Sequence, residues 1–153
     1  MSDLLQVYKN ILLVDDDPDD RDLFAEAVTI IDPTINITIK RDGEELMDCL
    51  RTISAKFDLI FLDLNMPRKN GKECLTEIKA NEVHANTPII IYTTSLNPVD
   101  IEETYTQGAS FFLRKPNSFE ELKDILAVLL RRKVLAREKG RETFVVNGAF
   151  NVA

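Results

Sequence analysis

Cysteine and histidine are scarce in this 153-residue sequence, and their scarcity excludes several kinds of site. The two cysteines, Cys49 and Cys74, are too few for a disulfide framework, and each lies in a helix-like segment beside apolar residues. We therefore interpret both as small, half-buried apolar residues. The single histidine, His84, lies in a polar connector with neither a cysteine nor a second histidine nearby. A zinc site or a histidine-based catalytic triad is not expected.

The sequence also lacks a long apolar segment and an excess of positive charge. No apolar run approaches the roughly 20 residues that span a bilayer, and the N-terminal stretch has no basic-then-apolar signal pattern. The formal net charge of −7 disfavours non-specific binding to nucleic acid or to anionic membranes. These absences predict a cytoplasmic protein with no nucleic-acid partner and no membrane partner. The length suits one domain with a sizeable core.

What the sequence does contain is a regular alternation of short apolar runs and amphipathic segments. Such runs predict strands, mostly buried on both faces, at residues 10–14, 35–39, 59–63, 89–92 and 110–113. Helical spacing of apolar residues predicts a helix after each strand, with the N-cap residues Asp17, Asp42, Asn70, Asn97 and Ser118. This alternation predicts a single α/β domain with a five-stranded parallel sheet and helices on both faces.

Polar residues follow several of these strands. Asp15 and Asp16 come after the first strand, Asp63 ends the third, and Lys115 follows the fifth. Because the carboxyl ends of parallel strands share one edge of the sheet, these side chains should converge there. The adjacent carboxylates of Asp15 and Asp16 would repel each other without a cation. Three carboxylates and an ammonium group suit Mg²⁺ together with a phosphoryl group, which a carboxylate can accept.

Taken alone, the residues leave two points open. Asp63 could simply accept hydrogen bonds from loop amides. Side-chain alternation along the fourth strand says only that one of Thr93 and Thr94 points into the site.

Asp20, near the start of the first predicted helix, is explained by its favourable interaction with the positive end of the helix dipole.

Four motifs, in this order, resemble those of the receiver domain of two-component response regulators. They are LVDDD at 13–17, LDLNMP at 62–67, YTTS at 92–95 and RKP at 114–116. Together, at the strand ends, they are highly specific, and the resemblance covers residues 9–136. It implies the doubly wound, flavodoxin-like (β/α)5 fold. LDLNMPRKNG and DGEEL also resemble segments of the small regulators that partner bacterial phytochromes.

The resemblance implies a phosphoacceptor and a set of metal ligands. Asp63 would accept the phosphoryl group and contribute to binding Mg²⁺. Asp16 would bind Mg²⁺ directly, and Asp15 would act mostly through metal-bound water. The backbone carbonyl of Asn65 would be a further ligand.

The resemblance also implies the residues that respond to phosphorylation. Lys115 would neutralise the phosphoryl group, and Thr93, in preference to Thr94, would be the switch hydroxyl. Phe112 falls on the family's aromatic switch position and, having no hydroxyl, can respond only by packing inward or outward. The Lys115–Pro116 peptide bond resembles one that is cis in this family.

The last helix, expected to run to about Ala136, indicates a contact between subunits. It carries a second apolar stripe of Leu130, Val134 and Leu135 between basic residues. This stripe suggests a homodimer through the last helix. A long helix whose basic side chains cover its own apolar spots explains the pattern equally well.

The remaining C-terminal residues are expected to form a tail. We assign residues 1–139 to the receiver domain and residues 140–153 to the tail. Phe144–Val146 followed by Asn147-Gly148 predict a short hairpin, either frayed or docked on its own or another subunit's surface. The sequence leaves no room for a DNA-binding output domain.

The resulting hypothesis is a single-domain response regulator. A sensor histidine kinase would phosphorylate Asp63 in the presence of Mg²⁺, and the output would be phosphorylation-dependent contacts with a downstream protein. The chain would be no enzyme beyond its own phosphorylation and dephosphorylation. The alternative is an Mg²⁺-dependent phosphatase with an aspartate nucleophile. That class has a D-x-D-x-T/V pattern after the first strand, which fails here because Asp17 is followed by Pro18 and Asp19.

Overall fold

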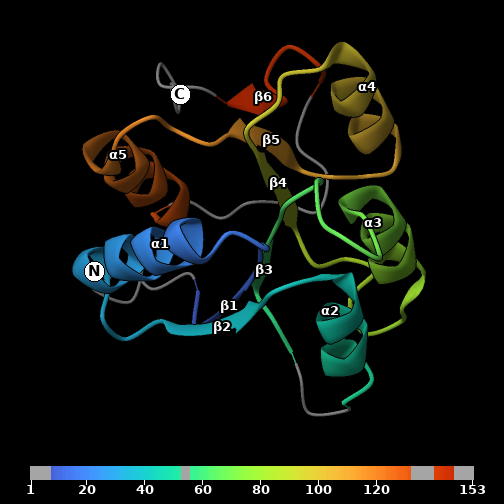
Figure 1. Cartoon of the computed structure of the whole chain (residues 1–153), viewed down its shortest axis with the longest axis horizontal. Helices are drawn as coiled ribbons and strands as arrows, with labels where there is room; N and C mark the ends of the chain where they lie inside the picture. The colour runs from blue at the N-terminus through green and yellow to red at the C-terminus, as the bar shows by residue number, and fades with distance from the viewer. Residues whose placement is uncertain (1–7, 53–55, 132–139, 147–153) are drawn as a thin grey trace.

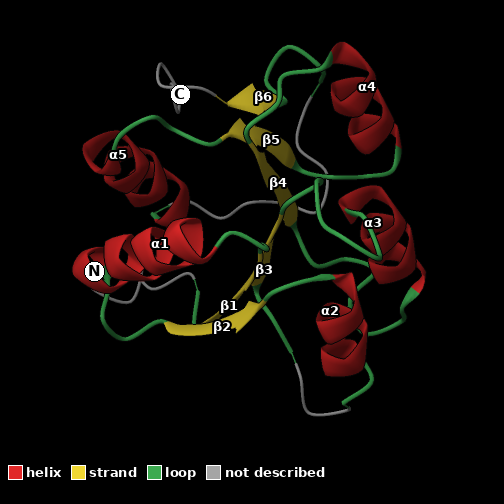
Figure 2. Ribbon diagram, in the orientation of Figure 1, coloured by secondary structure: helices red, strands yellow, loops and turns green. Residues whose placement is uncertain are grey.

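The computed structural model describes residues 8–52, 56–131 and 140–146, which alternate between strands and helices (Figures 1 and 2). The strands are β1 (Asn10–Val14), β2 (Asn36–Lys40), β3 (Leu59–Leu62), β4 (Ile89–Thr93), β5 (Phe111–Arg114) and β6 (Val145–Val146). The helices are α1 (Pro18–Ile31), α2 (Gly43–Leu50), α3 (Gly71–Ala80), α4 (Pro98–Thr106) and α5 (Phe119–Leu130). No helix among these residues is long and apolar enough to cross a membrane.

The strands form one parallel sheet between two layers of helices. Their order is β2-β1-β3-β4-β5-β6, and each neighbouring pair is parallel. Helices α1 and α5 cover one face and α2, α3 and α4 cover the other (Figure 1). Strands β1, β3 and β4 are therefore buried on both faces, as their continuous apolar runs predict. The first five strands have the order of the flavodoxin-like fold, which confirms the predicted fold class.

Each helix begins directly after its predicted N-cap residue. The side chains of Asp17, Asp42, Asn70, Asn97 and Ser118 all accept hydrogen bonds from the first turn of their helices. These bonds satisfy amide groups that have no partner within the helix. They fix where each loop ends at the carboxyl edge of the sheet.

Among the described residues the sheet has six strands, one more than the five predicted. Val145 and Val146 pair in parallel with Phe112 and Leu113 of β5, and the Phe112 amide donates to the Phe144 carbonyl at 2.9 Å. A strand at the edge of a sheet leaves backbone groups unpaired, and β6 satisfies those of β5. Residues 145–146 thus extend the sheet beyond β5. The second arm of the predicted hairpin, in residues 147–153, lies outside the described residues.

The last helix also differs from the prediction. Helix α5 ends at Leu130, with Arg131 as its C-cap, and residues 132–139, including Val134 and Leu135, lie outside the described part of the chain. Leu130 was expected on a second, outward stripe, but it is 5% exposed and belongs to the core shared with α1. The reason is that α5 packs along α1, which extends the buried stripe to the end of the helix (Figure 1).

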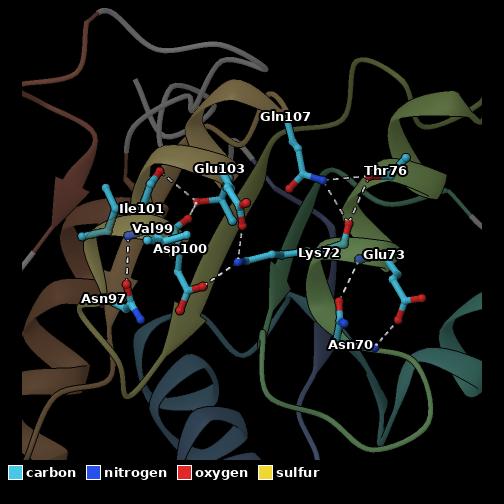
Figure 3. A network of polar contacts seen from close by, with 11 residues as sticks. Asn70, Lys72, Glu73, Thr76, Asn97, Val99, Asp100, Ile101, Glu103 and Gln107 are labelled. Atoms are coloured by element: carbon cyan, nitrogen blue, oxygen red, sulfur yellow. Dashed lines mark hydrogen bonds and ion pairs between the residues drawn. The ribbon is translucent and has the colours of Figure 1, made fainter.

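Helix α4 is held on its neighbours largely by polar contacts, because Thr104 is its only fully buried residue. Lys72 of α3 lies 2.6 Å from Asp100 and also pairs with Glu103 (Figure 3). The Gln107 side chain donates to the Thr76 hydroxyl at 2.8 Å (Figure 3). A helix with so few buried apolar contacts is a low-stability element of the fold.

We predict that Lys72→Met loosens α4. The variant removes the cation between Asp100 and Glu103, so unfolding should become easier by about 1 kcal/mol and α4 amides should exchange hydrogen faster. The matched control is Lys123→Met, since Lys123 is equally exposed at 29% but pairs with Glu120 within α5. Urea titration and hydrogen exchange measure both effects. If both variants had the same free energy of unfolding and the same exchange rates of α4 amides, Lys72 would not be what holds α4 in place.

Candidate functional site

Backbone hydrogen bonds just beyond the strands align the candidate residues along one edge of the sheet. The Asp63 amide donates to the Val14 carbonyl at 3.0 Å, and the Lys115 amide donates to the Thr93 carbonyl at 2.7 Å. The Asp15 amide likewise bonds to the Lys40 carbonyl at 3.0 Å. These bonds continue the parallel ladder by one residue, so the side chains after β1, β3 and β5 start from neighbouring positions.

Three carboxylates meet at this edge. Asp15, Asp16 and Asp63 each have an oxygen within 4.8 Å of the others. Asp15 is fully buried and Asp63 is 4% exposed, whereas Asp16 is exposed. Solvent therefore reaches the cluster at Asp16, whereas Asp15 and Asp63 are shielded from it.

Lys115 supplies the positive charge. Its Nζ atom lies 2.8 Å from Asp15 Oδ2, 2.8 Å from Asp20 Oδ2 and 3.7 Å from Asp63 Oδ2. The same atom lies 5.3 Å from the centre of the Tyr92 ring. Asp20 was assigned only to the helix dipole, so its contact with Lys115 was missed. The available signal was that the first turn of α1 rises from the same sheet edge.

Thr93 Oγ1 is a buried oxygen that makes no hydrogen bond. Asp15 Oδ2 is also buried, and it lies in the ion pair with Lys115 Nζ at 2.8 Å. Thr93 is fully buried, whereas Thr94 is exposed. Of the two threonines between which the sequence could not decide, Thr93 is therefore the buried one and Thr94 the exposed one. Oxygens that are buried without a partner favour a ligand that would satisfy them.

Burial is the largest influence on the pKa values of the carboxylates in the site. Burial raises the pKa of Asp63 to about 7, and the charges of Asp15 and Asp16 add to this, while Lys115 and the Asn65 amide oppose it. Burial also raises the pKa of Asp15. For Lys115, burial would lower the pKa, but its contacts with Asp15 and Asp20 outweigh burial and raise it. The site therefore holds a permanent ammonium group beside carboxylates that are costly to ionise.

The donor set fits a hard divalent cation. All the candidate ligand atoms are oxygens, the three carboxylates are close enough to share one ion, and two of them, Asp15 and Asp63, are buried. Mg²⁺ and Mn²⁺ both favour oxygen ligands, whereas sites for softer metals are built from sulfur and imidazole. A cation would also offset the burial and the repulsion that together raise the pKa of Asp63.

The other predicted residues lie in two places. Asn65 is exposed, and its amide donates to Asp63 Oδ1 at 3.4 Å. Phe112 is fully buried on the α4 side of the sheet, with its ring centre 6.2 Å from that of Phe144. The Lys115–Pro116 peptide bond is trans, so the expected cis bond was wrong.

Residues 140–146 cover part of this face. The Phe144 ring lies 5.2 Å from the Tyr105 ring of α4. Arg141 pairs with Glu102, and its guanidinium lies 4.6 Å from the centre of the Tyr105 ring. The segment is therefore attached both to the β5 edge and to α4.

The response regulator receiver domain family matches residues 11–127. The chain belongs to this family. Response regulator Rcp1 of Synechocystis sp. is 35% identical over 127 residues, which are 80% of this chain and 86% of that protein. Transcriptional regulatory protein CpxR of Escherichia coli K12 is 34% identical over 122 residues, but this receiver matches only 49% of its length.

Solved structures of receivers support the same conclusion. The Mn²⁺-bound form of Rcp1 has a TM-score of 0.76 and 32% identity, covering 83% of this chain and 98% of that one. The phosphorylated cyanobacterial phytochrome response regulator RcpA has a TM-score of 0.75 and 32% identity, covering 80% and 91%. The bacteriophytochrome response regulator AtBRR is 26% identical with a TM-score of 0.66, covering 81% and 92%. This receiver therefore resembles regulators that work with phytochromes.

We predict that Asp63→Asn stabilises the metal-free protein above neutral pH. Because the folded-state pKa of Asp63 is raised, its protonation stabilises the fold at low pH, and this contribution is lost as the pH rises from about 4 to about 7. The variant should therefore be more stable than wild type by about 2 kcal/mol at about pH 8 and equally stable near pH 4.

Urea titrations across this pH range, with a chelator present, measure the difference. Asp124→Asn, at an exposed position of α5, is the control for loss of one negative charge and should show no such trend. A stability difference between Asp63→Asn and wild type that stays constant with pH would contradict the prediction.

Proposed function

We propose that this receiver takes a phosphoryl group onto Asp63 from the phosphohistidine of a sensor histidine kinase and signals by altered protein contacts. The observation that carries the proposal is the site itself. Asp63 is buried at the end of a central strand, with two carboxylates within 4.8 Å and the Lys115 ammonium group at 3.7 Å. A phytochrome-type kinase is the favoured donor class, because the similar proteins Rcp1 and RcpA include a phytochrome response regulator.

Mg²⁺ is the proposed cofactor. Asp15, Asp16, Asp63 and the backbone carbonyl of Asn65 would hold it, with Asp15 acting mostly through water. The Mn²⁺-bound form of Rcp1 supports a divalent ion in this family. When bound, Mg²⁺ would offset negative charge on the phosphoryl oxygens and on the carboxylates.

The transfer itself needs positioning and charge balance. A carboxylate oxygen of Asp63 attacks phosphorus, the P–N bond of the phosphohistidine breaks, and its electron pair stays on the imidazole nitrogen. The product is an acyl phosphate on Asp63. Lys115 is placed to neutralise the added charge, since it already lies near both Asp63 and Asp15.

Thr93 and Phe112 would transmit the change. The buried Thr93 hydroxyl has no hydrogen-bond partner, so it is available to bond a phosphoryl oxygen on Asp63. Movement of Thr93 would leave space that Phe112 can enter, and this changes the surface of α4 and β5. Helix α4, which is held mainly by polar contacts, is suited to such a shift.

The output would be a contact between this surface and a downstream protein. Its chemistry would be limited to phosphorylation and dephosphorylation of Asp63, and a kinase partner of this class implies a cytoplasmic location. No observation favours the phosphatase alternative.

Homodimerisation through the last helix remains a prediction. Leu130 is no longer expected to take part in that contact, because its side chain is buried in the core. Sedimentation at tens of micromolar, with and without a phosphoryl mimic, would detect or exclude it.

We predict that acetyl phosphate with Mg²⁺ adds one base-labile phosphoryl group to the wild type and none to Asp63→Asn. Intact-mass analysis measures the adduct. Lys115→Met should slow phosphorylation by about 100-fold, because removing one preorganised charge costs this order of rate. Lys123→Met controls for the loss of a lysine away from the site. An adduct on Asp63→Asn would refute the phosphoacceptor assignment.

A further inference from the structure

Arg68 has an unusual backbone conformation in the loop that follows Asp63. Its φ is 65°, and within the described ranges it is the only residue other than glycine with a positive φ. The Lys69 amide donates to the Pro67 carbonyl at 2.7 Å, across Arg68. A hydrogen bond between residues two apart around a positive φ is typical of the classic γ-turn, a strained conformation. Something outside the turn must hold it.

The Arg68 side chain provides that restraint. Its Nη2 atom lies 2.6 Å from Asp42 Oδ2, and its Nε atom lies 2.9 Å from Glu44 Oε1. Asp42 is only 6% exposed, and its other oxygen accepts from the Glu45 amide at 2.9 Å as the N-cap of α2. Arg68 is therefore anchored to a carboxylate that the helix itself holds in place.

Close backbone packing leaves this loop little freedom at either end. The Gly71 amide donates to the Leu64 carbonyl at 2.9 Å, and a Cβ atom at Gly71 would lie 2.2 Å from the Asp63 carbonyl oxygen. A Cβ atom at Gly43, the first residue of α2, would lie 2.6 Å from Lys69 Cβ. The loop is thus pressed between the end of β3 and the start of α2, and it carries Asn65.

We propose that Arg68 is a positioning residue of the metal site. Its ion pair with Asp42 holds residues 64–70 in the strained turn, and this fixes the backbone that presents the Asn65 carbonyl to the divalent cation. The inference rests on the proposed function. It adds a residue whose side chain contacts Asp42 and Glu44 and which acts through the loop.

The test is calorimetric titration of Mg²⁺ into the full chain. Arg68→Ala should weaken binding by about tenfold, as loss of outer supports of metal ligands commonly does. Asp42→Asn keeps an N-cap residue but loses the charge, so it should weaken binding to a similar extent. The double variant should be no weaker than either single variant, because both remove the same interaction. Arg41→Ala is the matched control, since Arg41 pairs with Glu45 at the same helix end, and it should stay within about twofold of wild type.

Arg68→Gly separates the ion pair from the strain. Glycine adopts a positive φ without strain, so this variant should fold at least as stably as Arg68→Ala and still bind Mg²⁺ weakly. With acetyl phosphate, all three single variants of the pair should need more Mg²⁺ for half-maximal phosphorylation, with rates at saturating Mg²⁺ within about twofold of wild type. A merely structural role would not produce this split.

The outcomes are distinguishable. Wild-type affinity in Arg68→Ala and Asp42→Asn would overturn the positioning role and leave the proposed function intact. Additive losses in the double variant would overturn the ion pair as the cause. If the wild type itself bound no Mg²⁺, the proposed function would fail first, and this inference with it.

Discussion

The structure depends on the balance between buried carboxylates and one lysine. Asp15 and Asp63 are held at the sheet edge by backbone bonds that the parallel ladder requires, so they cannot move apart to reduce their repulsion. Lys115 lies near both and compensates for part of their charge. Burial, with added repulsion from Asp15 and Asp16, still raises the pKa of Asp63 to about 7. A cation would offset both effects, so the fold favours a divalent ion at this edge of the sheet.

A rigid sheet and a weakly held helix have complementary roles around this site. Strands β1, β3 and β4 are buried on both faces and fix the carboxylates, whereas α4 is attached mainly through Lys72, Gln107 and their partners (Figure 3). A change at Thr93 of the proposed kind would therefore act between a rigid sheet and a helix of low stability.

Much of this arrangement could be predicted from the sequence because the deciding signals are local. Apolar runs predicted the first five strands, N-cap residues predicted where helices begin, and the strand ends predicted which carboxylates gather. The sequence did not reveal what depends on distant packing. Asp20 contacts Lys115 across 95 positions of sequence, Leu130 is buried only because α5 lies along α1, and Val145 pairs with β5 at the edge of the sheet. No local pattern distinguishes these outcomes.

The attachment of residues 140–146 to β5 has a consequence for recognition. Phe144 and Arg141 occupy the strand edge and the Tyr105 ring that a visiting protein would otherwise meet. A protein that bound this surface would compete with residues 140–146, so its apparent affinity would fall in proportion to the time that the surface is uncovered. Deleting residues 140–153 would then strengthen such binding without altering any contact of the bound protein.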